Sequence, residues 1–141
     1  MAMVLDSLSI RKFGSYGSGN GQFSCPWDVA SDRSGCVYVA DRGNHRVQVF
    51  TPDGGYLRKF GKSGSGNREL YRPFTICVDS DDLMYVGENG NNRVSVFTYE
   101  GVFLKSFGSK GSGPGLDGIA VDQCGVVYVS DYGNNRVQIF S

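Results

Sequence analysis

The sequence lacks most of the features on which enzymes and membrane proteins are commonly built. Its 141 residues include a single histidine, His45, and no Ser-His-Asp or Cys-His ordering, so acid–base catalysis has few groups to use. No run of about 18 apolar residues exists, which excludes a transmembrane helix. The opening MAMVLDSLSI carries Asp6 in its apolar stretch and no basic segment, so a signal peptide is not expected.

A net charge and a cysteine framework are also missing. Fourteen Lys and Arg residues balance fourteen Asp and Glu residues, so no overall field favours nucleic acid or a membrane surface. Cys25, Cys36, Cys77 and Cys124 form no Cys-x-x-Cys pair, which argues against a disulfide or zinc framework. There is no Asn-x-Ser/Thr glycosylation site. These absences predict a cytoplasmic protein with no cofactor, no bound metal and no membrane partner.

The sequence does contain an internal repeat, which occurs in three copies, the third of them incomplete. The copies begin with FGSYGSGNGQF, FGKSGSGNREL and FGSKGSGPGL, and Phe13, Phe60 and Phe107 are spaced by 47 residues. Asn91 and Asn134 are 43 residues apart, so the third copy is shorter by four in its opening loop. A period of this length, with about four short apolar runs per copy, is typical of β-propeller blades. The predicted fold is therefore all-β.

Each copy predicts a sheet of four strands, named a to d. Strand a is expected at 27–31, 74–78 and 117–121, strand b at 36–40, 83–87 and 126–130, strand c at 47–50 and 137–140, and strand d at 56–60. Residues 8–13 align with strand d. The predicted order is a tail at 1–7, an isolated outer strand at 8–13, blades at 14–60 and 61–107, and a blade lacking its outer strand at 108–141.

This order leaves one strand without a sheet and one sheet without its last strand. Two chains related by a two-fold axis can each donate the N-terminal strand to the partner's last blade, which would close a ring of six blades. The same homodimer would cover apolar blade faces that a monomer leaves in water. Alternatively, the chain is a fragment of a larger protein that carries all the blades.

A repeated motif suggests a family. The runs YVADRGNHRVQVF, YVGENGNNRVSVF and YVSDYGNNRVQIF closely resemble the NHL repeat, which builds six-bladed β-propellers. The glycine-rich connectors look most like those of animal tripartite-motif ubiquitin ligases with a C-terminal NHL propeller. The resemblance implies a non-catalytic binding scaffold, because the RING, B-box and coiled-coil segments of those ligases are absent here. Glu88 and Asp82 depart from the pattern, replacing a loop Asp and a turn Gly.

An acid and an arginine recur in every copy. The pairs are Asp41 with Arg46, Glu88 with Arg93, and Asp131 with Arg136. A catalytic or ligand-binding role is one interpretation. Because every copy has the pair, an architectural role is the better interpretation, with the acid holding loop amides and the arginine tying neighbouring strands.

A metal-dependent enzyme, similar to a propeller lactonase or amidating lyase, is the competing hypothesis. Asp28 lies near the start of strand a, where some propeller enzymes hold calcium, and Asp117 is the other acid in this region. Calcium needs six to eight oxygen ligands, which this pair does not supply. His45 has no metal-binding partner in the sequence, and the other copies carry Asn92 and Asn135 at its position.

Loop composition differs between the two faces of the predicted disc. The a–b and c–d turns are acidic, whereas the b–c loops and the d–a connectors are mildly basic and carry aromatic residues. The residues expected to form a ligand-binding face are Tyr16, Arg42, His45, Lys62, Arg68, Tyr71, Arg72, Lys110 and Tyr132. Cations interleaved with rings suit RNA, and Tyr and Arg are also frequent in protein-binding hot spots. The partner is thus a protein or an RNA, unless these are ordinary solvated loops.

Overall fold

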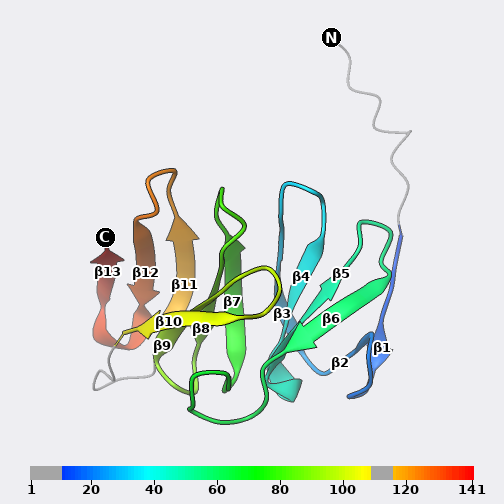
Figure 1. Ribbon diagram of the computed structural model, residues 1–141. Coiled ribbons are helices and arrows are strands. Elements are labelled where there is room, and N and C mark those ends of the chain that lie inside the picture. The colour runs from blue at the N-terminus through cyan, green and yellow to red at the C-terminus, as the bar shows by residue number, and fades with distance from the viewer. Residues whose placement is uncertain (1–10, 109–115) are drawn as a thin grey trace, which may run out of the picture.

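The computed structural model describes residues 11–108 and 116–141, which form three antiparallel sheets side by side (Figure 1). Blade 1 contains β3 (Pro26–Ser31), β4 (Val37–Asp41), β5 (Arg46–Phe50) and β6 (Tyr56–Phe60), and blade 2 contains β7 (Pro73–Val78), β8 (Met84–Glu88), β9 (Arg93–Phe97) and β10 (Phe103–Phe107). Blade 3 contains β11 (Leu116–Val121), β12 (Val127–Asp131) and β13 (Arg136–Phe140). The predicted all-β blade architecture is confirmed.

Two details of the loops were not predicted from the sequence. The glycine-rich connector before blade 1 contains a short parallel pair, β1 (Ser15–Tyr16) and β2 (Gln22–Phe23), and Ser63 and Leu70 form the corresponding bridge before blade 2. Single turns of 3-10 helix lie at Arg42–Asn44 and Tyr132–Asn134, between the second and third strands. The left-handed residues that end these turns are His45 and Asn135.

The core lies between the sheets rather than within one of them. Val47 and Val49 of β5 pack against Ile76 and Val86 of blade 2 in one buried cluster. A second cluster joins blade 2 to blade 3 through residues such as Val94 and Val129. Each sheet is therefore stabilised by apolar area that it buries against a neighbour.

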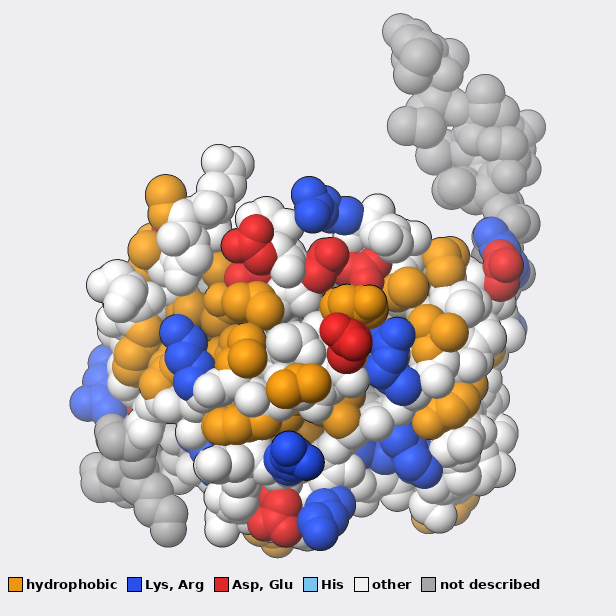
Figure 2. Space-filling model, in the orientation of Figure 1, with side chains coloured by type: hydrophobic (Ala, Val, Ile, Leu, Met, Phe, Trp, Pro, Cys, Tyr) orange, Lys and Arg blue, Asp and Glu red, His pale blue; other side chains and the backbone are white. Residues whose placement is uncertain are grey.

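The outward faces of the first and last blades remain open. Val29 of blade 1 is 62% exposed, and Val137 and Ile139 of blade 3 are 65% and 63% exposed. Their counterparts between the blades, Ile76 and Val47, are buried. Figure 2 shows the outer strands, with apolar side chains across the middle of the view and acidic side chains toward its upper rim.

The predicted N-terminal outer strand falls partly outside the described residues, which begin at Arg11. Residues 11–13 form no strand pair within the described chain. Pairing of residues 8–13 with a second chain therefore remains a prediction. Among the described residues, no helix is long and apolar enough to span a membrane.

Candidate functional site

The repeated acid and arginine form an ion pair at the same place in each blade. The acid is the last residue of the second strand, and the arginine opens the third strand directly opposite it. Arginine Nε lies 2.7 Å from Asp41, 2.8 Å from Glu88 and 2.7 Å from Asp131. All three carboxylates are buried. Buried charges must be paired and hydrogen-bonded to be tolerated, so the surroundings of these pairs matter.

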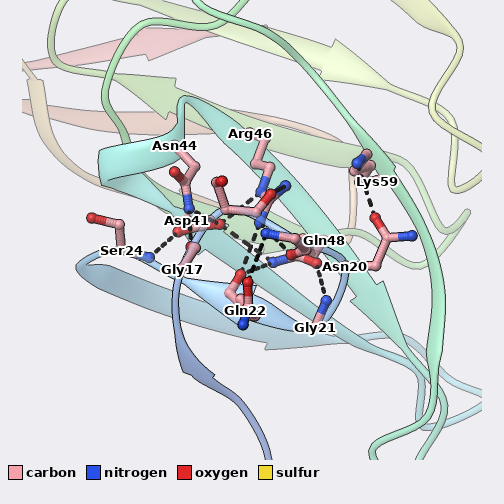
Figure 3. A network of polar contacts seen from close by, with 12 residues as sticks. Gly17, Asn20, Gly21, Gln22, Ser24, Asp41, Asn44, Arg46, Gln48 and Lys59 are labelled. Carbon is pink, nitrogen blue, oxygen red and sulfur yellow. Dashed lines mark hydrogen bonds and ion pairs between the residues drawn. The ribbon is translucent and has the colours of Figure 1, made fainter.

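In blade 1 the ion pair is surrounded by the backbone of the connector (Figure 3). Asp41 Oδ1 accepts from the Ser24 amide at 2.8 Å. Arg46 donates to the carbonyl oxygens of Ser18, Gly19 and Gln22 at 2.8–2.9 Å. Gln48 then donates to the Gln22 carbonyl and accepts from the Gly21 amide. The arginine thus pairs with the acid of the neighbouring strand and also ties the connector to the sheet.

Blade 2 repeats this network with a different acid. Arg93 donates to the carbonyl oxygens of Ser65, Gly66 and Glu69, at the same sequence separations as in blade 1. Glu88 is one methylene longer than the aspartate of the other copies, and the shorter Ser95 replaces the glutamine. The Ser95 hydroxyl donates to Glu88 at 2.6 Å, so the two size changes compensate. The departure at Glu88 leaves the ion pair and the hydrogen bonds from the arginine to the connector intact.

In blade 3 the Asp131 carboxylate accepts from Asn134, Arg136 and Gln138. The hydrogen bond from Asn134, followed by that from Arg136, holds the pKa of Asp131 below its usual value. The Arg136 side chain is 48% exposed, whereas that of Arg46 is 7% exposed. Residues 109–115 of the third connector, including the predicted ligand-face residue Lys110, lie outside the described residues.

A second repeated network occupies the opposite, acidic end of each blade. Asp32 Oδ2 accepts from the Tyr38 hydroxyl at 2.8 Å, and Asp79 accepts from Tyr85 in the same way. Burial, followed by the hydrogen bond to Asp79, raises the pKa of Tyr85 to about 12. These acids also accept from the amides of their own turns. The acidic rim is therefore partly used in holding the hairpins.

The loop face, which is formed by the b–c loops and the connectors, carries one cluster of rings and cations between blades 1 and 2. The Arg42 guanidinium lies 5.0 Å above the Trp27 ring, and that of Arg72 lies 5.8 Å above the Tyr71 ring. The ring centroid of His45 lies 4.9 Å from that of Tyr71, with the two rings tilted at 46° to each other. These contacts come from cation–π and aromatic attraction. Trp27 was not predicted to belong to this face.

His45 links the first two blades. Its Nδ1 accepts from the Arg72 amide at 3.0 Å, so the b–c turn of blade 1 is joined to the connector of blade 2. Burial and the positive charges of Arg72 and Arg42 lower the pKa of His45. The neutral imidazole is the form that can accept this hydrogen bond.

The structure brings together four of the predicted ligand-face residues and separates the others. Arg42, His45, Tyr71 and Arg72 form the cluster, and a cavity of about 160 Å³ next to it is lined by Trp27, Arg42, Phe74 and Asn89. The other predicted ligand-face residues that the structure describes are exposed and take no part in the ring and cation contacts of the cluster. They are Tyr16, Lys62, Arg68 and Tyr132.

The acid proposed for an axial metal site has protein partners. The two carboxylate oxygens of Asp28 accept from the amides of Val29 and Ile76, the latter at 3.0 Å across the blade interface. Across residues 11–108 and 116–141, no three His, Cys, Asp or Glu side chains are grouped closely enough to hold a metal ion.

Solved structures define the class of this protein. It resembles virginiamycin B lyase from Staphylococcus aureus with a TM-score of 0.71 and 15% identity, over 97% of this chain and 46% of that chain. It also resembles the WD40 β-propeller domain of Doa1 with a TM-score of 0.61 and 15% identity, over 76% of this chain and 33% of that one. At these identities the likeness shows the fold alone: the chain forms β-propeller blades.

Within that class, two segments of the chain, residues 23–50 and 116–140, match the family model for the NHL repeat. A stretch of 49 residues is 47% identical to E3 ubiquitin-protein ligase TRIM71 of Rattus norvegicus, covering 35% of this chain and 6% of that protein. Protein lin-41 of Caenorhabditis elegans is 48% identical over 34% of this chain and 4% of its own length. The chain thus spans a small part of these relatives. The predicted resemblance to tripartite-motif NHL propellers is confirmed.

Removal of Arg46 should destabilise the protein more than removal of Arg136. We expect Arg46→Ala to lower the free energy of unfolding by about 3 kcal/mol, because it leaves a buried Asp41 charge unpaired. Arg136→Ala should cost clearly less, because the Arg136 side chain is 48% exposed and Asn134 and Gln138 still donate to Asp131 without it. Denaturant titration of both variants measures the difference, and equal losses would contradict the structural role given to Arg46.

His45 should make stability depend on pH. Its folded-state pKa is below the ordinary value of 6.5, so its contribution is present above that value. The contribution is lost as the pH falls through the lowered folded-state pKa. His45→Asn, which copies Asn92 and suits the left-handed φ of 54°, should remove this dependence. Urea titrations between about pH 7.5 and about pH 5.5 test this. An unchanged dependence in His45→Asn would rule out His45 as the responsible group.

Proposed function

We propose that this chain is a non-catalytic scaffold that binds a macromolecule through its loop face. The observation that carries the proposal is the cluster of Trp27, Arg42, His45, Tyr71 and Arg72, which combines three rings with two guanidinium groups beside a small cavity. Partly exposed Trp, Tyr and Arg side chains held in place by one another are the groups that dominate binding interfaces. Lys62, Arg68 and Tyr132 would extend this surface.

A protein is the first candidate partner, and RNA is the second. The chain has no net charge, so a protein partner needs no compensating field. The interleaving of cations and rings supports RNA, whose unpaired bases stack on such rings. Binding to RNA would weaken steeply as salt rises, because phosphate contacts release counterions.

The assembly that presents this face is proposed to be a two-fold homodimer. The support is the apolar surface left open on blades 1 and 3, where Val29, Val137 and Ile139 are mostly exposed. A second copy would cover both surfaces at once, and two copies of three blades would make a closed ring. The outcome would be a scaffold with two equivalent loop-face clusters.

The loop face is tested with two matched arginine variants. Arg42→Ala should remove partners captured by the immobilised protein from a cell lysate, or weaken a measured affinity about tenfold. Arg33→Ala, which changes an exposed arginine in the turn at the opposite end of blade 1, should leave binding unchanged. Nuclease treatment and a salt series separate protein from RNA partners. Equal capture by the wild type and Arg42→Ala would contradict the proposed face.

The homodimer is tested by sedimentation or light scattering of the purified chain. We expect a mass near twice 15.3 kDa. On dilution the dimer should first dissociate into folded monomers with unchanged strand content. The two core clusters that hold the three blades together lie within one chain and do not depend on the partner. A folded monomer at all concentrations would contradict the proposed assembly.

A further inference from the structure

Residues 11–13 already lie against blade 1 as an outer strand lies against the blade that follows it. The Phe13 ring is 4.8 Å from Phe50, and Phe60, the last residue of β6, is 4.8 Å from Phe97 in the next blade. The turn glycines fit closely in both places. A Cβ atom on Gly54 would lie 2.9 Å from Phe13, and one on Gly101 would lie 3.2 Å from Phe60.

The sequence around Phe13 matches that of a known outer strand. Residues 10–13 read Ile-Arg-Lys-Phe, and residues 57–60 of β6 read Leu-Arg-Lys-Phe. The segment therefore has both the sequence and the inter-blade contact of an outer strand, while the described residues contain no sheet for it to join.

Within the described residues, blade 3 has no strand of this kind. Its sheet has three strands in the order β11-β12-β13, whereas the other two blades have a fourth strand beside β5 and β9. A cavity of about 250 Å³ beside the end of β13 is lined by Phe107, Val127 and Phe140, among others. At the corresponding place in blade 2, Phe103 of the fourth strand packs against the core cluster and contacts Phe97 at 5.8 Å. The cavity therefore corresponds to the place that Phe103 of the fourth strand takes in blade 2.

We propose that β13 of one copy takes residues 8–13 of a second copy as its fourth, antiparallel strand. This inference rests on the proposed homodimer and states how its two copies join. The β5–β6 pairing, in which Gln48 faces Lys59 and Val47 faces Phe60, fixes the register. By the repeat, the Lys12 of one copy lies opposite Gln138 of the other, and Phe13 lies opposite Val137.

The exposed apolar faces of blades 1 and 3 also support a second copy of this chain as the binding partner. Ile76 packs against Val47 and Val49 where blades 1 and 2 meet. Val29 is the counterpart of Ile76, and Val137 with Ile139 are the counterparts of the two valines. When residues 8–13 join β13, the blade that follows them brings Val29 toward these exposed side chains. A second copy is therefore complementary in sequence and in apolar surface.

Cysteine cross-linking tests the register. In a background with Cys25 and Cys124 changed to Ser, and Cys36 and Cys77 changed to Ala, Lys12→Cys protein is mixed with Gln138→Cys protein. Opposed residues of an antiparallel pair have the spacing that a disulfide needs. We expect a disulfide between the two variants on oxidation. Lys12→Cys mixed with Ile139→Cys should give little, because adjacent side chains point to opposite faces of a strand.

The outcomes separate this inference from the homodimer itself. A dimer by mass without the expected disulfide, or with equal cross-linking at Ile139→Cys, overturns the strand exchange and leaves the dimer standing. A monomeric chain overturns both. Neither result bears on the loop face, which is measured by ligand capture.

A second variant is designed to fill the cavity beside the end of β13. Ser9 aligns with Tyr56 and Phe103, whose rings contact Phe50 and Phe97 in the complete blades. Ser9→Phe should lower the dimer Kd by about tenfold, because a buried ring adds both apolar area and aromatic contacts. Ser7→Phe, which aligns with the turn residue Gly54, should give no such gain. Unchanged or weaker association of Ser9→Phe would contradict the inference.

Discussion

A propeller blade has two apolar faces, and the structure depends on covering both. A single sheet of this sequence alternates Val, Ile, Tyr and Phe in a way that leaves neither side suited to water. Blade 2 meets this requirement because it lies between blades 1 and 3, and its residues belong to both core clusters. The terminal blades meet it on one side only, which is why Val29 and Val137 are mostly exposed although their counterparts are buried. In the described chain, the apolar faces of blades 1 and 3 that meet no neighbouring sheet therefore stay exposed.

The buried acid–arginine network solves a different problem. A glycine-rich connector has a large conformational entropy and little apolar surface with which to hold itself in place. Arg46 and Arg93 compensate by binding three connector carbonyl oxygens each, while the paired acid accepts an amide from the connector's end. The two described connectors, before blades 1 and 2, are therefore each fixed to their own sheet. Tyr71 and Arg72 of the loop-face cluster lie at the end of the second connector, where the Tyr71 amide donates to Glu88, so the network positions this part of the cluster.

Much of the fold could be predicted because the strand pattern is repeated. The strand expected at 56–60 is found at Tyr56–Phe60, and that expected at 27–31 is found at Pro26–Ser31. The network around Arg46 could not be predicted, since its acceptors are backbone carbonyl oxygens 24–28 residues away, and these are chemically alike in every residue. The contact between His45 and Arg72 was also missed. It depends on a left-handed turn in one blade meeting the connector of the next.

The sequence by itself determined the blades, their order and the recurrence of an acid with an arginine, because periodic apolar residues and repeated motifs are local properties. Only the tertiary structure decided which charges are buried, which rings and cations meet on the loop face, and which faces stay open. Those features depend on how one sheet lies against the next, and residues about one repeat apart come together only after the sheets have stacked. The same stacking places Phe13 against Phe50.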